Sequence, residues 1–352
     1  MKVGIVTLPL HTNYGGILQA WALQTVIERM GHEPSHVFRD LLGPLILYKD
    51  MTPEEIAAFQ RHTARFVGRY IRCDGTPFKD ISPDRYDALV VGSDQIWRNR
   101  YTEFFHIGLR NAFLDFAKDW DVRRVAYAPS FGIDSWEAPE SEIPACSELL
   151  RKFDAVSCRE ASGAAICRDV LGVEARVVAD PTLLLGSEDY GRLVDEGETE
   201  PPPGDLMAYV LDRDEEKDML LASVASRFAL RPFLMNDHPE GEGSRVQPAV
   251  EQWLRGIRDS RLVVTDSFHA TVFSILFRRP FIVTGNPKRG LSRIESLLSR
   301  LGLERHLVTS VEGLDREFDY AIPDSAYERL AEFRAEGLGF LSDTLSRKEN
   351  GT

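Results

Sequence analysis

The sequence contains few cysteines, no excess of basic residues and no long apolar run, and each absence excludes a class of protein. Its four cysteines show no CxxC spacing, so we expect a reduced, cytoplasmic protein in which Cys158 and Cys167 fill the core. The formal charge of −13 argues against a broad nucleic-acid-binding surface. No apolar run reaches the roughly 18 residues of a membrane-spanning helix, and the first residues read as a strand rather than a signal peptide.

What the sequence does contain is a repeated alternation of short apolar strands and amphipathic helices. Its 352 residues are long enough for two domains, and the alternation predicts an α/β fold with parallel sheets. An acidic, proline-rich stretch at 188–205 reads as a linker. We predict a first domain at 1–195 with a helical insertion at about 41–80, a second domain at 206–310, and a helical tail at 311–352 that folds back on the first domain. We place a small-molecule site in the cleft between the domains.

The chain is organised around residues 259–276, DSRLVVTDSFHATVFSIL. The β-branched run at 261–265 predicts a buried strand, and apolar residues at helical spacing from Phe268 predict a helix. The turn between them carries Asp266, Ser267 and His269. In open α/β sheets, ligands bind outside the carboxyl ends of strands, where helix N-termini attract anions. His269 is therefore the main candidate for catalysis, and a hydrogen-bonded core histidine is the alternative.

Other predicted strands also end in glycine or small polar residues. The first strand is followed by Asn13, Tyr14, Gly15 and Gly16, a glycine loop before a helix from about residue 17. Such a loop lets the backbone approach a ligand or cap the helix, and a tight turn with positive φ is the alternative. The loop is not GxGxxG, so it does not indicate a dinucleotide site.

Two further strand ends carry candidate residues for the cleft. The strand at 86–91 runs into Ser93, Asp94 and Gln95, and the strand at 122–128 runs into Ser130. Capping of a helix is the alternative role for Ser93 and Asp94. No spacing of His, Cys, Asp or Glu resembles a metal site, so no metal or other cofactor is expected.

Arg159 lies at the turn between a strand at 153–158 and a helix. A cation is unfavourable at a helix N-terminus unless an anion lies beside it, so Arg159 is a candidate for binding an anionic ligand. The alternative is an ion pair with Glu160 or with a nearby aspartate.

Five segments, in this order, resemble the polysaccharide pyruvyl transferase family over about residues 1–301. They are NYGGILQAWALQ, VGSDQIW, YAPSFG, SCREASGAAICRDVLG with VVADPTLLL, and TDSFHATVFSILFRRPFIV. The resemblance implies two Rossmann-like domains arranged as in GT-B glycosyltransferases, with the active site between them. It also implies transfer of a pyruvyl unit from phosphoenolpyruvate to a sugar of a polysaccharide or glycan precursor, including a lipid-linked one, as a ketal.

The same resemblance assigns roles to several residues. It implies that His269 binds the donor and acts as acid and base, and that Arg159 binds the donor phosphate or carboxylate. Asp266 is a candidate for orienting His269. Ser267-Phe268 stand where many members carry Arg-Leu, so Ser267 and the cations Lys288, Arg289 and Arg293 are the remaining candidates for binding the donor.

Two other functions are compatible with the sequence. A GT-B-like glycosyltransferase would bind a nucleotide sugar in its second domain, and the polar loop at 236–247 is compatible with that. A non-catalytic carbohydrate-binding relative would have lost the donor arginine.

Overall fold

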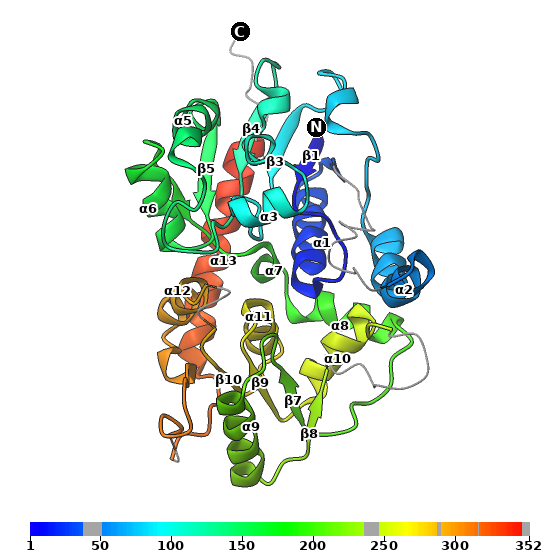
Figure 1. The fold of residues 1–352 in the computed structure, drawn as a ribbon, viewed down its shortest axis with the longest axis vertical. Coiled ribbons are helices and arrows are strands. Elements are labelled where there is room, and N and C mark those ends of the chain that lie inside the picture. The colour runs from blue at the N-terminus through cyan, green and yellow to red at the C-terminus, as the bar shows by residue number, and fades with distance from the viewer. Residues whose placement is uncertain (38–50, 236–245, 287–289, 316, 347–352) are drawn as a thin grey trace. The chain divides into compact units, whose positions relative to one another are not determined.

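The computed structural model describes residues 1–37, 51–235, 246–286, 290–315 and 317–346 (Figure 1). The chain divides into two compact units, each assembled from segments that are distant in the sequence. The first unit contains Met1–Leu47, Val67–Leu184 and Ala331–Thr352, and the second contains Tyr48–Phe66 and Leu185–Leu330. The contacts thus group the chain differently from the linear limits expected from the sequence.

The described strands of the first unit form one parallel sheet in the order β2-β1-β3-β4-β5-β6. The central strand β3 has the sequence ALVV and is fully buried, as a parallel strand covered by helices requires. From β1 the chain adds β2 on one side, and it then adds β3, β4, β5 and β6 in turn on the other side. The direction of winding therefore reverses between β1 and β3. The strands are β1 (Lys2–Val6), β2 (Glu33–His36), β3 (Ala88–Val91), β4 (Arg123–Ala126), β5 (Ala155–Cys158) and β6 (Arg176–Val177).

Helices and an aromatic cluster build the core of the first unit. The Trp97 ring stacks on Phe113 at 4.9 Å between centroids, and its indole N–H donates to the Ala112 carbonyl. Cys158 and Cys167 are buried with their sulfurs 3.6 Å apart, which confirms their expected place in the core. The helices are α1 (Tyr14–Arg29), α3 (Asn99–Phe104), α4 (Leu109–Ala112), α5 (Ile143–Leu150), α6 (Ala161–Asp169) and α7 (Pro181–Leu184).

The second unit contains a parallel sheet in the order β10-β9-β7-β8, whose winding reverses between β7 and β9. The predicted central strand and helix are present as β9 and α11, and every residue of both is buried. The strands are β7 (Leu206–Tyr209), β8 (Pro232–Leu234), β9 (Leu262–Thr265) and β10 (Phe281–Val283). The helices are α8 (Ser187–Glu196), α9 (Glu215–Phe228), α10 (Val250–Asp259), α11 (Phe268–Leu276) and α12 (Ser292–Leu301).

Part of the predicted linker is a helix. Residues 188–196 belong to α8, whose Tyr190, Leu193 and Val194 are buried at helical spacing. The Tyr190 ring packs edge-on against Phe273 of α11 at 4.7 Å between centroids. This apolar face overrides the acidic composition that suggested a linker.

Two helices contain residues of both units. The first fourteen residues of α2 (Pro53–Tyr70) and the first seven of α13 (Asp324–Leu345) belong to the second unit, and their remaining residues belong to the first. Within the first unit, Arg334 of α13 donates to the Leu183 carbonyl at 2.7 Å, and Arg123 donates to the Thr344 carbonyl at 2.8 Å. Short 3₁₀ turns at Phe78–Asp80, Asp115–Ala117, Glu140–Glu142 and Glu304–His306 complete the described elements.

We expect Gly337→Ala to lower the free energy of unfolding by about 1–2 kcal/mol, although alanine is the better helix former. A Cβ at Gly337 would lie 2.6 Å from the Tyr127 hydroxyl and 2.9 Å from Leu184 Cδ2. The tyrosine is held because its buried hydroxyl donates to the Ala179 carbonyl at 2.8 Å. Urea denaturation of the full chain measures the change.

Gly339 of the same helix provides the matched control. A Cβ there meets nothing within 4 Å, so Gly339→Ala is expected to raise the free energy of unfolding by about 0.5–1 kcal/mol. Equal stabilisation by both substitutions would contradict close packing of α13 on Tyr127.

Candidate functional site

In both units, polar side chains gather at the carboxyl ends of strands. In each unit, some of them lie where the winding of the sheet reverses. In the first unit this place lies between the ends of β1 and β3, and in the second between the ends of β7 and β9. Open α/β sheets bind ligands at such switch points, because the loops of neighbouring strands diverge there.

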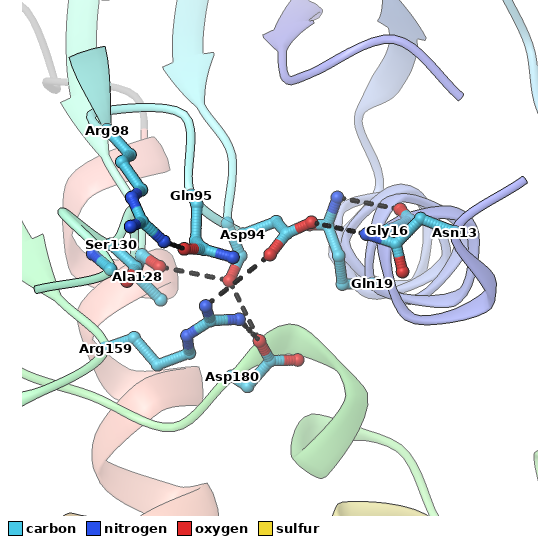
Figure 2. Close-up of polar contacts among 12 residues, drawn as sticks. Asn13, Gly16, Gln19, Asp94, Gln95, Arg98, Ala128, Ser130, Arg159 and Asp180 are labelled. Atoms are coloured by element: carbon cyan, nitrogen blue, oxygen red, sulfur yellow. Dashed lines mark hydrogen bonds and ion pairs between the residues drawn. The ribbon is translucent and has the colours of Figure 1, made fainter. Parts of the chain in front are cut away.

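In the first unit, Arg159 is surrounded by carboxylates (Figure 2). Its guanidinium donates to Asp180 at 2.8 Å and lies 3.6 Å from Asp94 and 3.8 Å from Glu160. All four side chains are almost completely buried. The ion pairs considered from the sequence as the alternative role of Arg159 are therefore present.

Burial and the carboxylates act in opposite directions on the pKa of Arg159. Burial lowers it by disfavouring the charged form, but Asp180, Asp94 and Glu160 outweigh that effect, and the pKa rises above its ordinary value. Asp180 also adds to the effect of burial in raising the pKa of Tyr127 well above its ordinary value. One permanent cation thus faces three carboxylates.

Asp94 has an unusual backbone conformation at the end of β3. Its φ is 62°, in the left-handed region that aspartate and asparagine tolerate better than other non-glycine residues. Its carbonyl accepts from the Ser130 N–H at 2.9 Å, and its carboxylate accepts from the Asn13 side-chain amide at 3.1 Å. The next helix, α3, begins only at Asn99, so Ser93 and Asp94 do not cap a helix.

The expected glycine loop is in fact the first turn of α1. The helix begins at Tyr14, and neither Gly15 nor Gly16 has a positive φ, so the tight-turn alternative is wrong. Asn13 stands at the N-cap position, but its side chain bonds to Asp94 instead of capping. Gly16 allows this approach, because a Cβ there would lie 3.1 Å from the Asn13 amide nitrogen and 3.3 Å from an Asp94 oxygen.

The remaining predicted residues of the first unit connect these strand ends. The Ser93 hydroxyl lies 2.9 Å from Asp180 and 3.0 Å from the Ala128 carbonyl, and it donates to one of them at a time. The Ser130 hydroxyl donates to Glu160 at 2.8 Å. Gln95 accepts from the buried Arg98 guanidinium at 2.9 Å. Ser93 and Ser130 are thus connected to Arg159 through Asp180 and Glu160.

A pocket opens at the switch point of the first unit. Its lining includes His11, Asn13, Gln19, Asp94 and Phe105. The Gln19 amide donates to Thr7 at 3.1 Å and to the Gly16 carbonyl at 2.9 Å, which fixes the loop after β1 to α1. The pocket is therefore lined by a carboxylate, by other polar groups and by the rings of His11 and Phe105.

In the second unit, His269 lies in the first turn of α11 and is 6% exposed. Ser267 is the N-cap, and its hydroxyl accepts from the Ala270 N–H at 3.4 Å. The Ser267 N–H donates to the Thr265 hydroxyl at 3.0 Å, which fixes the turn after β9. His269 is thus held just inside a helix N-terminus, as the sequence predicts.

Asp266 binds four donors, which come from two loops and the first turn of α9. Its carboxylate accepts from the N–H groups of Leu211 and Asp212 at 2.6 and 3.2 Å, from Lys217 at 3.0 Å and from Asn286 at 2.7 Å. The Asn286 amide also donates to Asp212 at 2.8 Å. Asp266 therefore fixes the loops after β7, β9 and β10 to one another.

We expect Asp266→Asn to lower the free energy of unfolding by about 3 kcal/mol, because the new amide group would face donors only. Thermal unfolding followed by circular dichroism measures the loss. The control is Asp218→Asn, which breaks a half-exposed pair with Arg213 and is expected to cost at most about 0.5 kcal/mol. Similar losses for both variants would contradict the central role of Asp266.

Of the three cations of the second unit predicted to bind the donor, only Arg293 lies within the described residues. Arg293 is buried in α12, with its guanidinium carbon 5.9 Å from the centroid of the Phe268 ring. Lys288 and Arg289 lie outside the described residues, as does most of the polar loop at 236–247.

Three residues bound to Asp266 were not predicted from the sequence: Asp212, Lys217 and Asn286. Asp212 follows β7 and Asn286 follows β10, so both carry the signal used for the other residues, a polar side chain just after a buried strand. Lys217 has no such signal, because it lies in the first turn of α9, which brings it to Asp266 only in the folded unit.

Across the described ranges, no three His, Cys, Asp or Glu side chains are placed to share a metal ion. No helix in the described part of the chain has the length and hydrophobicity to cross a membrane.

Comparison with solved structures agrees with the fold. A glycosyltransferase from Rickettsia africae superposes with a TM-score of 0.51 at 10% identity, over 97% of this chain and 96% of that one. UGT89C1 of Arabidopsis thaliana, complexed with UDP-L-rhamnose, gives a TM-score of 0.49 at 10% identity, over 96% and 99% of the two chains. The predicted fold class, two Rossmann-like domains of the GT-B-like kind, is confirmed.

Comparison with sequences gives the family. No curated protein matches the chain. The family described as polysaccharide pyruvyl transferase matches residues 13–288, which contain the polar groups of both units. The chain belongs to the polysaccharide pyruvyl transferase family.

Proposed function

We propose that the protein transfers a pyruvyl unit from phosphoenolpyruvate to a sugar of a glycan or glycan precursor, where it forms a ketal on two hydroxyls. The observation that carries this proposal is the turn between β9 and α11. It places a histidine in the first turn of a buried helix, inside the segment that matches the family.

This turn suits a donor with two anionic groups. The N-terminus of α11 offers N–H groups and a positive dipole to a phosphate or carboxylate. Arg293 of α12 lies near the Phe268 ring, which begins the same helix, and its guanidinium suits either anion. Arg159 is not assigned to the donor here, because it already faces three carboxylates.

The reaction requires one acid and two attacking hydroxyls. His269 gives a proton to the methylene carbon, and the first sugar hydroxyl forms a bond to the adjacent carbon and loses its proton. The second hydroxyl then attacks the same carbon and loses its proton, the bond from that carbon to the phosphate oxygen breaks, and phosphate leaves with that electron pair. One of the two hydroxyl protons restores His269, and the other leaves with the phosphate. A histidine is suited to the first transfer because it exchanges protons near neutral pH.

The test combines donor binding with product formation. We expect calorimetry to show saturable binding of phosphoenolpyruvate, and we expect phosphate release when methyl glycosides of glucose, galactose or mannose are added. Proton NMR of the product would show the methyl group of a pyruvate ketal. Binding of UDP-glucose without binding of phosphoenolpyruvate would overturn the proposal in favour of glycosyl transfer.

A further inference from the structure

Four hydrogen-bond donors converge on one place at the switch point of the second unit. Two of them are consecutive backbone N–H groups, those of Leu211 and Asp212 in the loop after β7. The other two are the ammonium group of Lys217, in the first turn of α9, and the side-chain amide of Asn286, which follows β10. Backbone N–H groups and a cation that converge at the end of a strand are the usual components of an anion site.

The anion that these donors bind is part of the chain itself. The Asp266 carboxylate accepts from the Leu211 N–H through Oδ1, and from the other three donors through Oδ2. Its side chain is fully buried, and the side chain of Lys217 is only 10% exposed. The place that the four donors surround is therefore filled by Asp266.

The charges around the four donors agree with one bound monoanion. Lys217 supplies the positive charge, and a lysine in the first turn of a helix is unfavourable unless an anion lies beside it. Two more carboxylates are close: Asp214 lies 4.0 Å from the Lys217 ammonium, and Asp212 accepts from the Asn286 amide at 2.8 Å. Because like charges repel, these carboxylates and Asp266 together oppose the binding of a second anion.

We propose that the four donors form an anion-binding site of the second unit, and that Asp266 occupies this site and excludes the anionic groups of other molecules from it. The ligand that fits the site is a small carboxylate anion, because the donors are arranged around a carboxylate. The inference goes beyond the proposed function, since it concerns the switch point whatever the donor is. It directs an anionic donor away from the loop after β7 and toward the N-terminus of α11.

Asp266→Ala in the presence of formate tests the proposal, because formate is a free carboxylate of the size of the group removed. Urea denaturation of the full chain would be compared in about 100 mM sodium formate and in sodium chloride at the same concentration. We expect formate to raise the folding equilibrium constant of Asp266→Ala at least about tenfold over chloride, which corresponds to about 1.4 kcal/mol. The wild type should not respond, because its site is occupied.

Two further variants provide controls for this experiment. Asp218→Ala removes another aspartate of the same unit, whose pair with Arg213 is half-exposed, and formate should not stabilise it. Asp266→Ala combined with Lys217→Met leaves the site without its cation. The formate concentration for half-maximal stabilisation should then rise at least about tenfold, since a hydrogen bond to a charged group is lost.

Amide NMR would locate the bound formate. In Asp266→Ala, formate should shift the N–H resonances of Leu211 and Asp212, and in the wild type it should leave them unchanged. Equal responses of the wild type and of Asp266→Ala would overturn the proposal. So would a folded Asp266→Ala variant that formate neither stabilises nor shifts.

Asp266→Ser replaces the alanine variant if that variant does not fold, because serine keeps one acceptor for the same donors. If the serine variant is also unfolded in buffer, it would be diluted from urea into formate and into chloride. Refolding in formate alone would support the anion site, and no refolding in formate would overturn it.

Discussion

Replacing Arg159 by glutamine is expected to lower the free energy of unfolding by about 3–5 kcal/mol. The substitution removes the cation and leaves Asp94, Glu160 and Asp180 buried beside one another, with exposed fractions of 3%, 1% and 1%. Removing one partner of a buried ion pair is costly because the remaining charge has lost its hydration and gains nothing in return. Urea denaturation at neutral pH measures the loss.

A matched control separates this loss from the effect of removing any arginine. Arg168→Gln in α6 is the control, because its pair with Asp169 is exposed on both sides and is expected to contribute at most about 0.5 kcal/mol. A loss below about 1 kcal/mol for Arg159→Gln would contradict a structural role for the ion pairs.

The parts of the fold that depend on local pattern were predictable from the sequence. The strand predicted at 261–265 is β9 at Leu262–Thr265, and the helix predicted from Phe268 is α11, which begins at that residue. Both signals are local, since a β-branched run and a helical spacing of apolar residues are read within one segment. His269 was placed correctly because its position follows from these two elements.

The parts that depend on distant residues were not predictable. β2 has the sequence EPSH and is a strand because it pairs with β1 in parallel. The first turn of α1 reads as a loop in the sequence because its glycines have poor helix propensity. The contact of Asn13 with Asp94 joins residues 81 positions apart, so no local pattern indicates it. The sequence leaves both an anionic ligand and an ion pair open for Arg159, because nothing near it in the chain shows that Asp180 approaches it.

The second large effect is expected at His269. We predict that His269→Gln lowers the rate of ketal formation by about 10²–10⁴-fold, the usual contribution of a general acid, while the KM for phosphoenolpyruvate changes less. Glutamine keeps a hydrogen-bonding side chain of similar size at the start of α11 but cannot deliver a proton. Single-turnover kinetics in D₂O would show whether the loss lies in transfer of hydrogen to the methylene carbon, since the wild type should then produce a monodeuterated methyl group.

His306 provides the matched contrast, because it is the kind of core histidine that His269 would be if it had no catalytic role. Its Nδ1 pairs with the Phe281 carbonyl at 2.9 Å, its ring stacks on the Phe281 ring at 4.2 Å, and burial lowers its pKa. His306→Gln is expected to lower the free energy of unfolding by about 1–3 kcal/mol, through the lost stacking and hydrogen bond, and to leave the rate per folded molecule unchanged. If His269→Gln shows the same pattern, reduced stability with an unchanged rate, then His269 is a structural histidine and the acid must be another group.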